Sequence, residues 1–169
     1  MTTKPMLLDA ALAVLRADEI LTIDAVAREA GMTKPGVVHH FATKEVLTLA
    51  VLEHQLDLWE AEILARAGAD ASAEDRLLAY VEHTLLGDMD TSDLVLLADP
   101  KLRHKLSERW ADRVKTWFGH LDEPHLTAVR LIADGAWINR CLGLLDLDEE
   151  IRSGTVALAS EVLQKGTSL

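Results

Sequence analysis

Apolar side chains recur every three or four residues along most of this chain, which is the spacing of one face of an α-helix. The first such stretch contains Leu8, Leu12 and Leu15, and the second begins at Ile23 and reaches Ala30. Leu and Ala dominate an apolar content of 49%, while aromatic residues reach only 4%. Because these are strong helix formers, the sequence predicts an all-α fold without strands.

Polar residues and glycine mark where the next helices begin and end. Thr22 is suited to cap the start of the second helix, and Gly31 to end it in a left-handed conformation. Thr33 then caps a short third helix, with Pro35 in its first turn, where a missing N–H costs nothing. Phe41 ends this helix, and we expect its ring to lie in the core.

A long fourth helix is predicted from Thr43 to about Gly68, with apolar residues on more than one face. Such a helix is clamped between layers of other helices. Stop signals divide the rest of the chain, among them the pair Asp99 and Pro100. The implied helices cover residues 73 to 86, 92 to 98, 100 to 121, 123 to 145 and 149 to 165.

The net charge of the chain is −11, which taken as a whole disfavours binding to nucleic acid. The distribution of this charge along the chain changes that interpretation. Residues 1 to 48 carry five Lys or Arg against six Asp or Glu, whereas residues 49 to 169 carry twelve against twenty-two. The acidic excess therefore belongs to the second part. The nearly neutral first part is compatible with contact to DNA.

No apolar stretch has the length of a signal peptide or a membrane span, so we expect a cytoplasmic protein with no membrane contact. The single cysteine, Cys141, lies in an apolar helical pattern and is expected to be a buried, inert thiol. Nothing in the sequence calls for a cofactor.

Residues 22 to 41 read as a helix, a three-residue turn and a second helix. Ala27 is small where the two helices would cross, and Gly31 supplies the turn. Helix pairs of this kind read DNA, but they also occur as plain helical hairpins. Spacing alone leaves both interpretations open.

The run AGMTKPGVVHHFATKEVL, from Ala30 to Leu47, resembles the N-terminal signature of the TetR family of bacterial repressors. In that signature a turn with Ser or Thr precedes a short recognition helix that ends in His-Phe, and Ser/Thr-Lys-Glu opens the fourth helix. The resemblance covers about residues 5 to 50. It implies a helix-turn-helix DNA-binding domain at residues 1–46 and a helical ligand-binding and dimerisation domain at residues 47–169.

Carried over position by position, the resemblance places one helix in the major groove of DNA. It assigns phosphate contacts to Thr22 and Thr33 at helix N-termini and to Lys44 at the start of the fourth helix. The residues of the recognition helix are Thr33, Lys34, Pro35, Gly36, Val37, His39 and His40. Val38 stands where the family usually has a tyrosine that contacts the backbone, so that contact is absent or passes to His39. Val37 and Val38 either touch a thymine methyl or pack inside, and packing is expected for at least one.

His39 and His40 lie near the end of the recognition helix, where the helix dipole and DNA phosphates favour protonation. We therefore predict that affinity for operator DNA strengthens toward about pH 6. Equal affinities at mildly acidic and mildly basic pH, measured at fixed salt, would contradict this.

The last two predicted helices carry apolar or small residues on two faces, although one chain offers them one core. We expect the second face to meet a symmetry mate, giving a homodimer through residues 123–165, with a monomer as the alternative. Large or polar residues suited to line a ligand pocket are Trp59, Tyr80, His83, Trp110, Trp117, Trp137, Asn139 and Arg140, although each also suits the core. As a set they favour an apolar or aromatic effector, which can also be anionic.

The function that follows is a ligand-responsive regulator, a repressor that binds operator double-stranded DNA as a homodimer. A small molecule would release it by moving the recognition helices from the separation of roughly 34 to 36 Å that successive major grooves require. The alternatives are a metal-responsive regulator, a helical adaptor and an enzyme. No phosphate loop, metal-ligand motif or nucleophile motif supports an enzyme. Two histidines have a carboxylate at helical spacing, His54 with Asp57 and His104 with Glu108. We interpret both pairs as exposed ion pairs rather than as catalytic groups.

Overall fold

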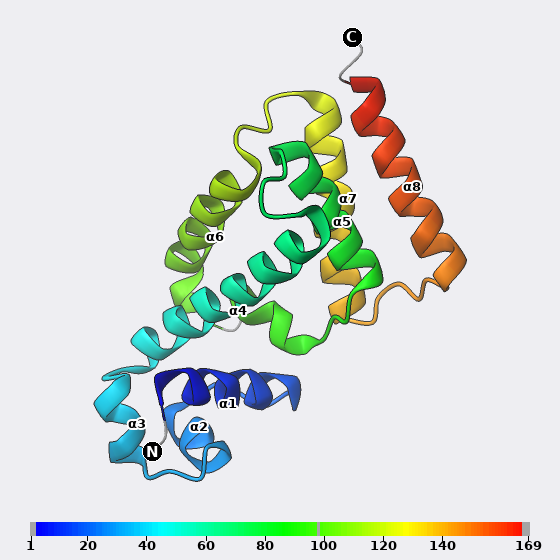
Figure 1. Cartoon of the computed structure of the whole chain (residues 1–169). Helices are drawn as coiled ribbons and strands as arrows, with labels where there is room; N and C mark the ends of the chain where they lie inside the picture. Colours follow the sequence, from blue (N-terminus) through cyan, green and yellow to red (C-terminus); the bar gives the residue numbers. More distant parts are fainter. Residues whose placement is uncertain (1–2, 98, 167–169) are drawn as a thin grey trace. The chain divides into compact units, whose positions relative to one another are not determined.

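The computed structural model describes residues 3–97 and 99–166 (Figure 1). Regular structure in these residues is helical, without any strand, which confirms the predicted all-α class. The α-helices and the short 3-10 helices (η) are, in chain order, α1 (Lys4–Arg16), α2 (Ile23–Glu29), α3 (Lys34–His40), α4 (Lys44–Ala67), α5 (Ala73–Leu86), η1 (Thr91–Leu97), η2 (Pro100–Leu102), α6 (Arg103–Phe118), α7 (Pro124–Cys141) and α8 (Glu149–Gly166).

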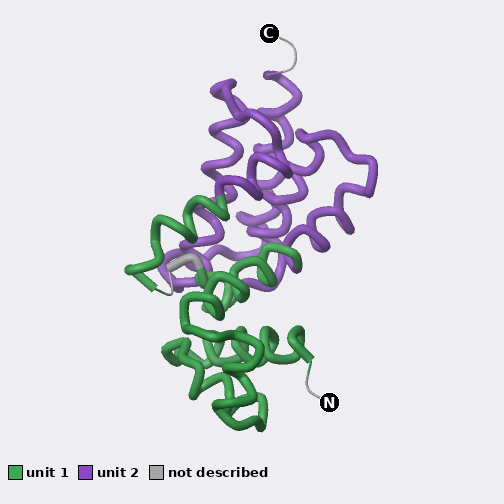
Figure 2. The backbone as a smooth tube through the Cα atoms, turned by 90° about the vertical axis from the view of Figure 1, so that its left-hand side faces the viewer, with its two compact units in different colours: residues 1–57, 90–110 green, residues 58–89, 111–169 purple. Residues whose placement is uncertain are grey.

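The chain forms two compact units, coloured separately in Figure 2. Unit 1 contains residues 1–57 and 90–110, and unit 2 contains residues 58–89 and 111–169. Helix α4 contributes to both units. The units group residues by packing, so the functional boundary predicted between residues 46 and 47 stays a prediction.

In unit 1, α1 packs against α2 and η1, and α2 packs against α3. The core is formed by fully buried apolar side chains such as Leu7, Val26 and Phe41. The predicted signals at the helix ends are confirmed, since the Thr22 hydroxyl accepts a hydrogen bond from the Ala25 N–H at 3.0 Å. Gly31 has a φ of +63°, a conformation that disfavours a side chain.

Residues 90 to 97 are joined to the N-terminal helices by polar contacts. The Arg16 guanidinium lies 2.6 Å from the Asp90 carboxylate, and the Thr91 hydroxyl donates to the Leu15 carbonyl at 3.0 Å. The Gln55 amide donates to the Asp93 carboxylate. These contacts explain why a segment far along the chain belongs to unit 1.

In unit 2, α5 packs against α7 and α8, which also pack against each other. Tyr80, Val129 and Ala159, one from each helix, are fully buried. Helix α5 begins with a capping box, in which the Ser72 hydroxyl accepts from the Asp75 N–H and the Asp75 carboxylate accepts from the Ser72 N–H. Cys141 is buried in this unit, as predicted.

Some predicted helices differ from the observed ones. The helix expected at residues 92 to 98 is the 3-10 helix η1, with a kink at Leu94, and residue 98 lies outside the described residues. The helix expected at residues 100 to 121 divides into η2 and α6 and stops before Gly119. Helix α7 stops before Gly143, short of the predicted residue 145. Both glycines have positive φ, which ends a right-handed helix.

Candidate nucleic-acid interface and ligand site

Helix α3 has one buried face and one exposed face. Val37 and the adjoining Phe41 are fully buried and anchor the helix in unit 1, whereas Val38 is exposed. Val37 is therefore a packing residue. Of the two valines, only Val38 is exposed enough to make the predicted contact with a thymine methyl group. The other predicted residues of this helix are exposed at Thr33, Lys34, Pro35 and His39 and half-buried at Gly36 and His40.

The start of α3 has the predicted capping arrangement. The Thr33 hydroxyl accepts a hydrogen bond from the Gly36 N–H at 3.3 Å, and the proline lies in the first turn. A Cβ atom at Gly36 would lie 2.8 Å from the Met32 side-chain methyl. A larger residue at this position would therefore have to displace the end of the Met32 side chain.

Lys34 has an ion-pair partner on the neighbouring helix. Its ammonium lies 2.9 Å from the Asp24 carboxylate of α2, and both side chains are exposed. Exposed ion pairs of this kind contribute at most about 1 kcal/mol. Another anion can therefore displace Asp24 from Lys34 at small cost.

Lys44, at the start of α4, lies 3.3 Å from the Asp99 carboxylate. The backbone N–H of Lys101, together with Lys44, lowers the pKa of Asp99. Two further ion pairs follow along α4, Glu45 with Lys105 and Glu53 with Arg109. The first turns of α4 are thus joined to residues 99 to 109 by a row of ion pairs, which sequence analysis missed because the partners are distant in the chain.

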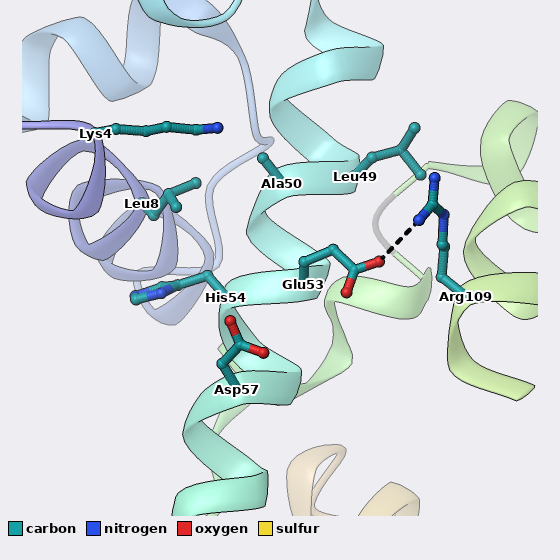
Figure 3. A pocket seen from close by; sticks show the side chains of 8 residues that line it. All are labelled: Lys4, Leu8, Leu49, Ala50, Glu53, His54, Asp57 and Arg109. Atoms are coloured by element: carbon teal, nitrogen blue, oxygen red, sulfur yellow. Dashed lines mark hydrogen bonds and ion pairs between the residues drawn. The ribbon is translucent and has the colours of Figure 1, made fainter. Parts of the chain in front are cut away.

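Unit 1 also has a cleft of ≈ 360 Å³ between α1, α4 and α6 (Figure 3). Its lining residues are Lys4, Leu8, Leu49, Ala50, Glu53, His54, Asp57 and Arg109. Glu53 and Arg109 pair at 3.5 Å, His54 pairs with Asp9 at 2.7 Å, and the Lys4 ammonium lies over the Phe41 ring. Because these charges are matched within the unit, we assign this cleft no ligand.

Four of the residues predicted to line a ligand pocket form an aromatic cluster in unit 2. The Trp59 ring centroid lies 5.9 Å from that of Tyr80 and 5.3 Å from those of His83 and Trp137. Trp59 meets Trp137 and His83 edge-on, a favourable arrangement for aromatic rings. We call these four residues the aromatic cluster.

The remaining predicted pocket residues do not belong to the aromatic cluster, although some lie beside it. Trp117 contacts Phe118, whose ring in turn contacts Tyr80. The Asn139 amide donates to the Gly135 carbonyl and is thus engaged on its own helix. Arg140 donates to the Thr84 carbonyl at 2.7 Å, next to the aromatic cluster. Trp110 belongs to unit 1 and is half-buried there.

The aromatic cluster contains two polar groups with different surroundings. The Tyr80 hydroxyl donates to Asp134 at 2.9 Å, and Arg130 holds the same carboxylate at 2.7 Å. Burial raises the pKa of Tyr80, so this residue stays a neutral donor. The sequence offered only one signal for this network, the helical spacing of Arg130 and Asp134.

His83 is 5% exposed, and neither ring nitrogen has a hydrogen-bond partner among the residues that the structure describes. Burial lowers the pKa of His83 from 6.5 to about 4, and the charges of Arg66 and Arg140 act in the same direction. The imidazole is therefore neutral near pH 7. A neutral imidazole offers one donor and one acceptor to a bound molecule.

Two other kinds of site are absent from the residues that the structure describes. No group of three or more His, Cys, Asp or Glu side chains lies close enough to hold a metal ion in the described part of the chain. Nor does that part contain a helix of the length and apolar character that crossing a membrane requires. The predicted exposed pair of His104 with Glu108 is present at 3.7 Å.

Comparison with known proteins gives two family matches. Residues 7–51 match the family described as bacterial regulatory proteins, tetR family, and residues 74–162 match the tetracyclin repressor-like C-terminal domain. The crystal structure of multidrug binding protein EbrR complexed with imidazole is similar to the chain, with a TM-score of 0.61 and 24% sequence identity. The similarity covers 93% of this chain and 87% of that one, and it shows a shared fold. No curated protein matches the chain.

Proposed function

This chain belongs to the TetR family of bacterial regulatory proteins, and we propose that it is a repressor that binds operator DNA as a homodimer and leaves it when a small molecule binds. Members of the family are transcriptional regulators. We assign DNA binding to residues 1–46 and ligand binding with dimerisation to residues 47–169. A bacterial repressor of this kind acts in the cytoplasm, where the DNA is.

The exposed face of α3 carries the proposal for DNA binding. Buried Val37 and Phe41 fix the helix in unit 1, so its opposite face is free to enter the major groove. We assign base or groove contacts to Lys34, Pro35, Gly36, His39 and His40. Phosphate contacts are assigned to Thr22, Thr33 and Lys44.

Exposed apolar side chains on α7 and α8 support the homodimer. Leu131 is 64% exposed and Leu158 is 56% exposed; Ile138, Ile151 and Leu142, the residue that follows α7, are also exposed. A second copy of the chain would bury these residues in a two-fold interface. Dimerisation also supplies two recognition helices for the two halves of a symmetric operator.

The aromatic cluster is our candidate effector site. Trp59, Tyr80 and Trp137 provide flat apolar surfaces, and His83 provides one donor and one acceptor that have no partners in the described part of the chain. This chemistry suits an aromatic effector with a polar group. If such an effector releases the protein from DNA, operator DNA must weaken effector binding by the same factor.

Selection of bound sequences from a random pool of double-stranded DNA tests this function. We expect an enriched sequence with two inverted half-sites, spaced by about 10 base pairs or a multiple of that length. A protein carrying Lys34→Ala and His39→Ala, both at exposed positions of α3, should enrich nothing while keeping its helical circular-dichroism signal. Recovery of no shared sequence by the unaltered protein would refute operator binding.

A further inference from the structure

A carboxylate lies beside the exposed start of α3, in the part of unit 1 that we assign to DNA binding. The Lys34 ammonium of α3 lies 2.9 Å from the Asp24 carboxylate, which comes from the first turn of α2. The two helices pack against each other in unit 1 (Figure 1). The Lys34 side chain is 58% exposed and that of Asp24 is 69% exposed, so a bound duplex can reach both. A negative charge therefore stands where the proposed interface meets an anionic polymer.

The Asp24 carboxylate acts on Lys34 rather than on a cation of its own helix. Arg28 lies four residues after Asp24 on α2, a spacing at which Asp and Arg side chains can pair. Arg28 instead pairs with Glu19. Among the residues that the structure describes, Lys34 is the one cation with which Asp24 forms an ion pair.

We propose that Asp24 is a positioning residue, which directs the Lys34 ammonium to the edge of a guanine in the major groove rather than to a phosphate. This inference rests on the proposed function, because it concerns the same DNA-binding site. An ammonium has three donors, so Lys34 can keep its bond to Asp24 and donate to a base with another. The O6 and N7 atoms of guanine are acceptors that lysine side chains commonly contact.

The preference for a base over a phosphate follows from charge. A phosphate bound to Lys34 would lie close to the Asp24 carboxylate and would be repelled by it. Guanine carries no net charge, so contact with its edge avoids this repulsion. Because exposed ion pairs are weak, we expect a bias of up to about fivefold. Phosphate contacts supply most of the affinity for non-operator DNA, so Asp24 should weaken that binding more than binding to the operator.

Selection from a random pool of double-stranded DNA, carried out in parallel on the unaltered protein and on single variants, tests this role. Lys34→Ala should remove a preference for guanine at one position of each half-site. Asp24→Asn should weaken the preference at that same position and leave the other positions unchanged, because it alters only where Lys34 points. A merely structural role of Asp24 would not act on a single base position.

Fluorescence anisotropy with two duplexes, the selected operator and a scrambled sequence of the same length, gives a second readout. Asp24→Asn should bind the scrambled duplex about threefold more tightly and gain less on the operator, so the ratio of the two affinities falls. In a Lys34→Ala background, Asp24→Asn should not change this ratio further. The matched control is Glu29→Gln, which removes a carboxylate from another exposed position of α2 and should leave the ratio unchanged.

Four results would overturn the positioning role of Asp24. They are a guanine preference that Lys34→Ala or Asp24→Asn leaves intact, an unchanged affinity ratio in Asp24→Asn, an equal fall of the ratio in Glu29→Gln, and a fall that persists in the Lys34→Ala background. A failure of the proposed function looks different, because the unaltered protein would then select no sequence. All three positions are exposed, so the variants should keep the helical circular-dichroism signal that shows they are folded.

Discussion

Lys44 is the proposed phosphate-binding residue whose surroundings the structure defines most fully. Asp99 lies 3.3 Å from its ammonium and would compete with a DNA phosphate for it. Asp99→Asn removes the competing charge. We expect the variant to bind operator DNA about threefold more tightly, the gain that release of a partly exposed ion pair allows.

Fluorescence anisotropy with a labelled operator measures this effect. Lys44→Ala should weaken binding and reduce by about one the number of counterions released, read from the dependence of the Kd on salt. Asp146→Asn makes the same change of charge in unit 2 and is the matched control. An equal gain with Asp146→Asn would assign the effect to net charge rather than to Lys44.

His83 makes stability depend on pH. In the unfolded chain its imidazole takes up a proton near pH 6.5, but in the folded protein only near pH 4. Between these values the unfolded chain binds more protons, so acidification favours unfolding. The full contribution is present above pH 6.5, and about 2 kcal/mol of it is lost between pH 7 and pH 5.

Urea unfolding of His83→Leu at these two pH values measures the contribution. The variant should lose less stability on acidification than the unaltered protein, by about 2 kcal/mol. His104→Gln, which changes an exposed histidine, should keep the original dependence. If His83→Leu also keeps it, another group is responsible.

At the scale of helices, the sequence predicted the features that depend on neighbours in the chain. Thr22 and Thr33 accept backbone hydrogen bonds at helix starts, as predicted, because the donating N–H groups lie three residues further along the chain. The premature ends of α6 and α7 were missed because Gly119 and Gly143 lie inside stretches that continue to look helical.

The candidate site was less predictable than the helices. Lys34 and Lys44 were identified by resemblance, but their carboxylate partners come from other elements. Sequence spacing also left open which of Val37 and Val38 packs inside. The packing of α3 in unit 1 buries Val37 and leaves Val38 exposed, and sequence spacing alone does not determine this packing. The clustering of Trp59 with Trp137 likewise arises from helix packing.

The capping box of α5 gives a prediction for this element. Ser72→Ala removes the acceptor for the Asp75 N–H and should lower the free energy of unfolding by about 1 kcal/mol. Chemical denaturation followed by circular dichroism measures the loss. Ser153→Ala, at an exposed position inside α8, should not destabilise the protein, and a similar loss there would argue against a capping effect.

At the scale of the whole molecule, the proposed homodimer would bury the exposed leucines of α7 and α8. Leu158→Glu places a charge at a 56% exposed position, where a partner chain would have to bury it. We expect a folded monomer with at least tenfold weaker operator binding, detected by analytical ultracentrifugation and anisotropy.

Ile20→Glu is the matched control for this variant. Ile20 is 76% exposed and belongs to unit 1, so the same change of charge should leave the oligomeric state unaltered. A dimeric Leu158→Glu protein would place the interface elsewhere, and a monomeric Ile20→Glu protein would show that added charge alone separates the chains.

The discontinuity of unit 1 has a consequence for synthesis on the ribosome. Helix α1 packs against η1, and Thr91 donates to the carbonyl of Leu15, yet η1 is translated after α4 and α5. Nascent segments generally fold in order of emergence, as complete units. The N-terminal helices of this chain must therefore wait, incompletely covered, until residue 110 has left the ribosomal tunnel, with residues 58–89 of the other unit already outside.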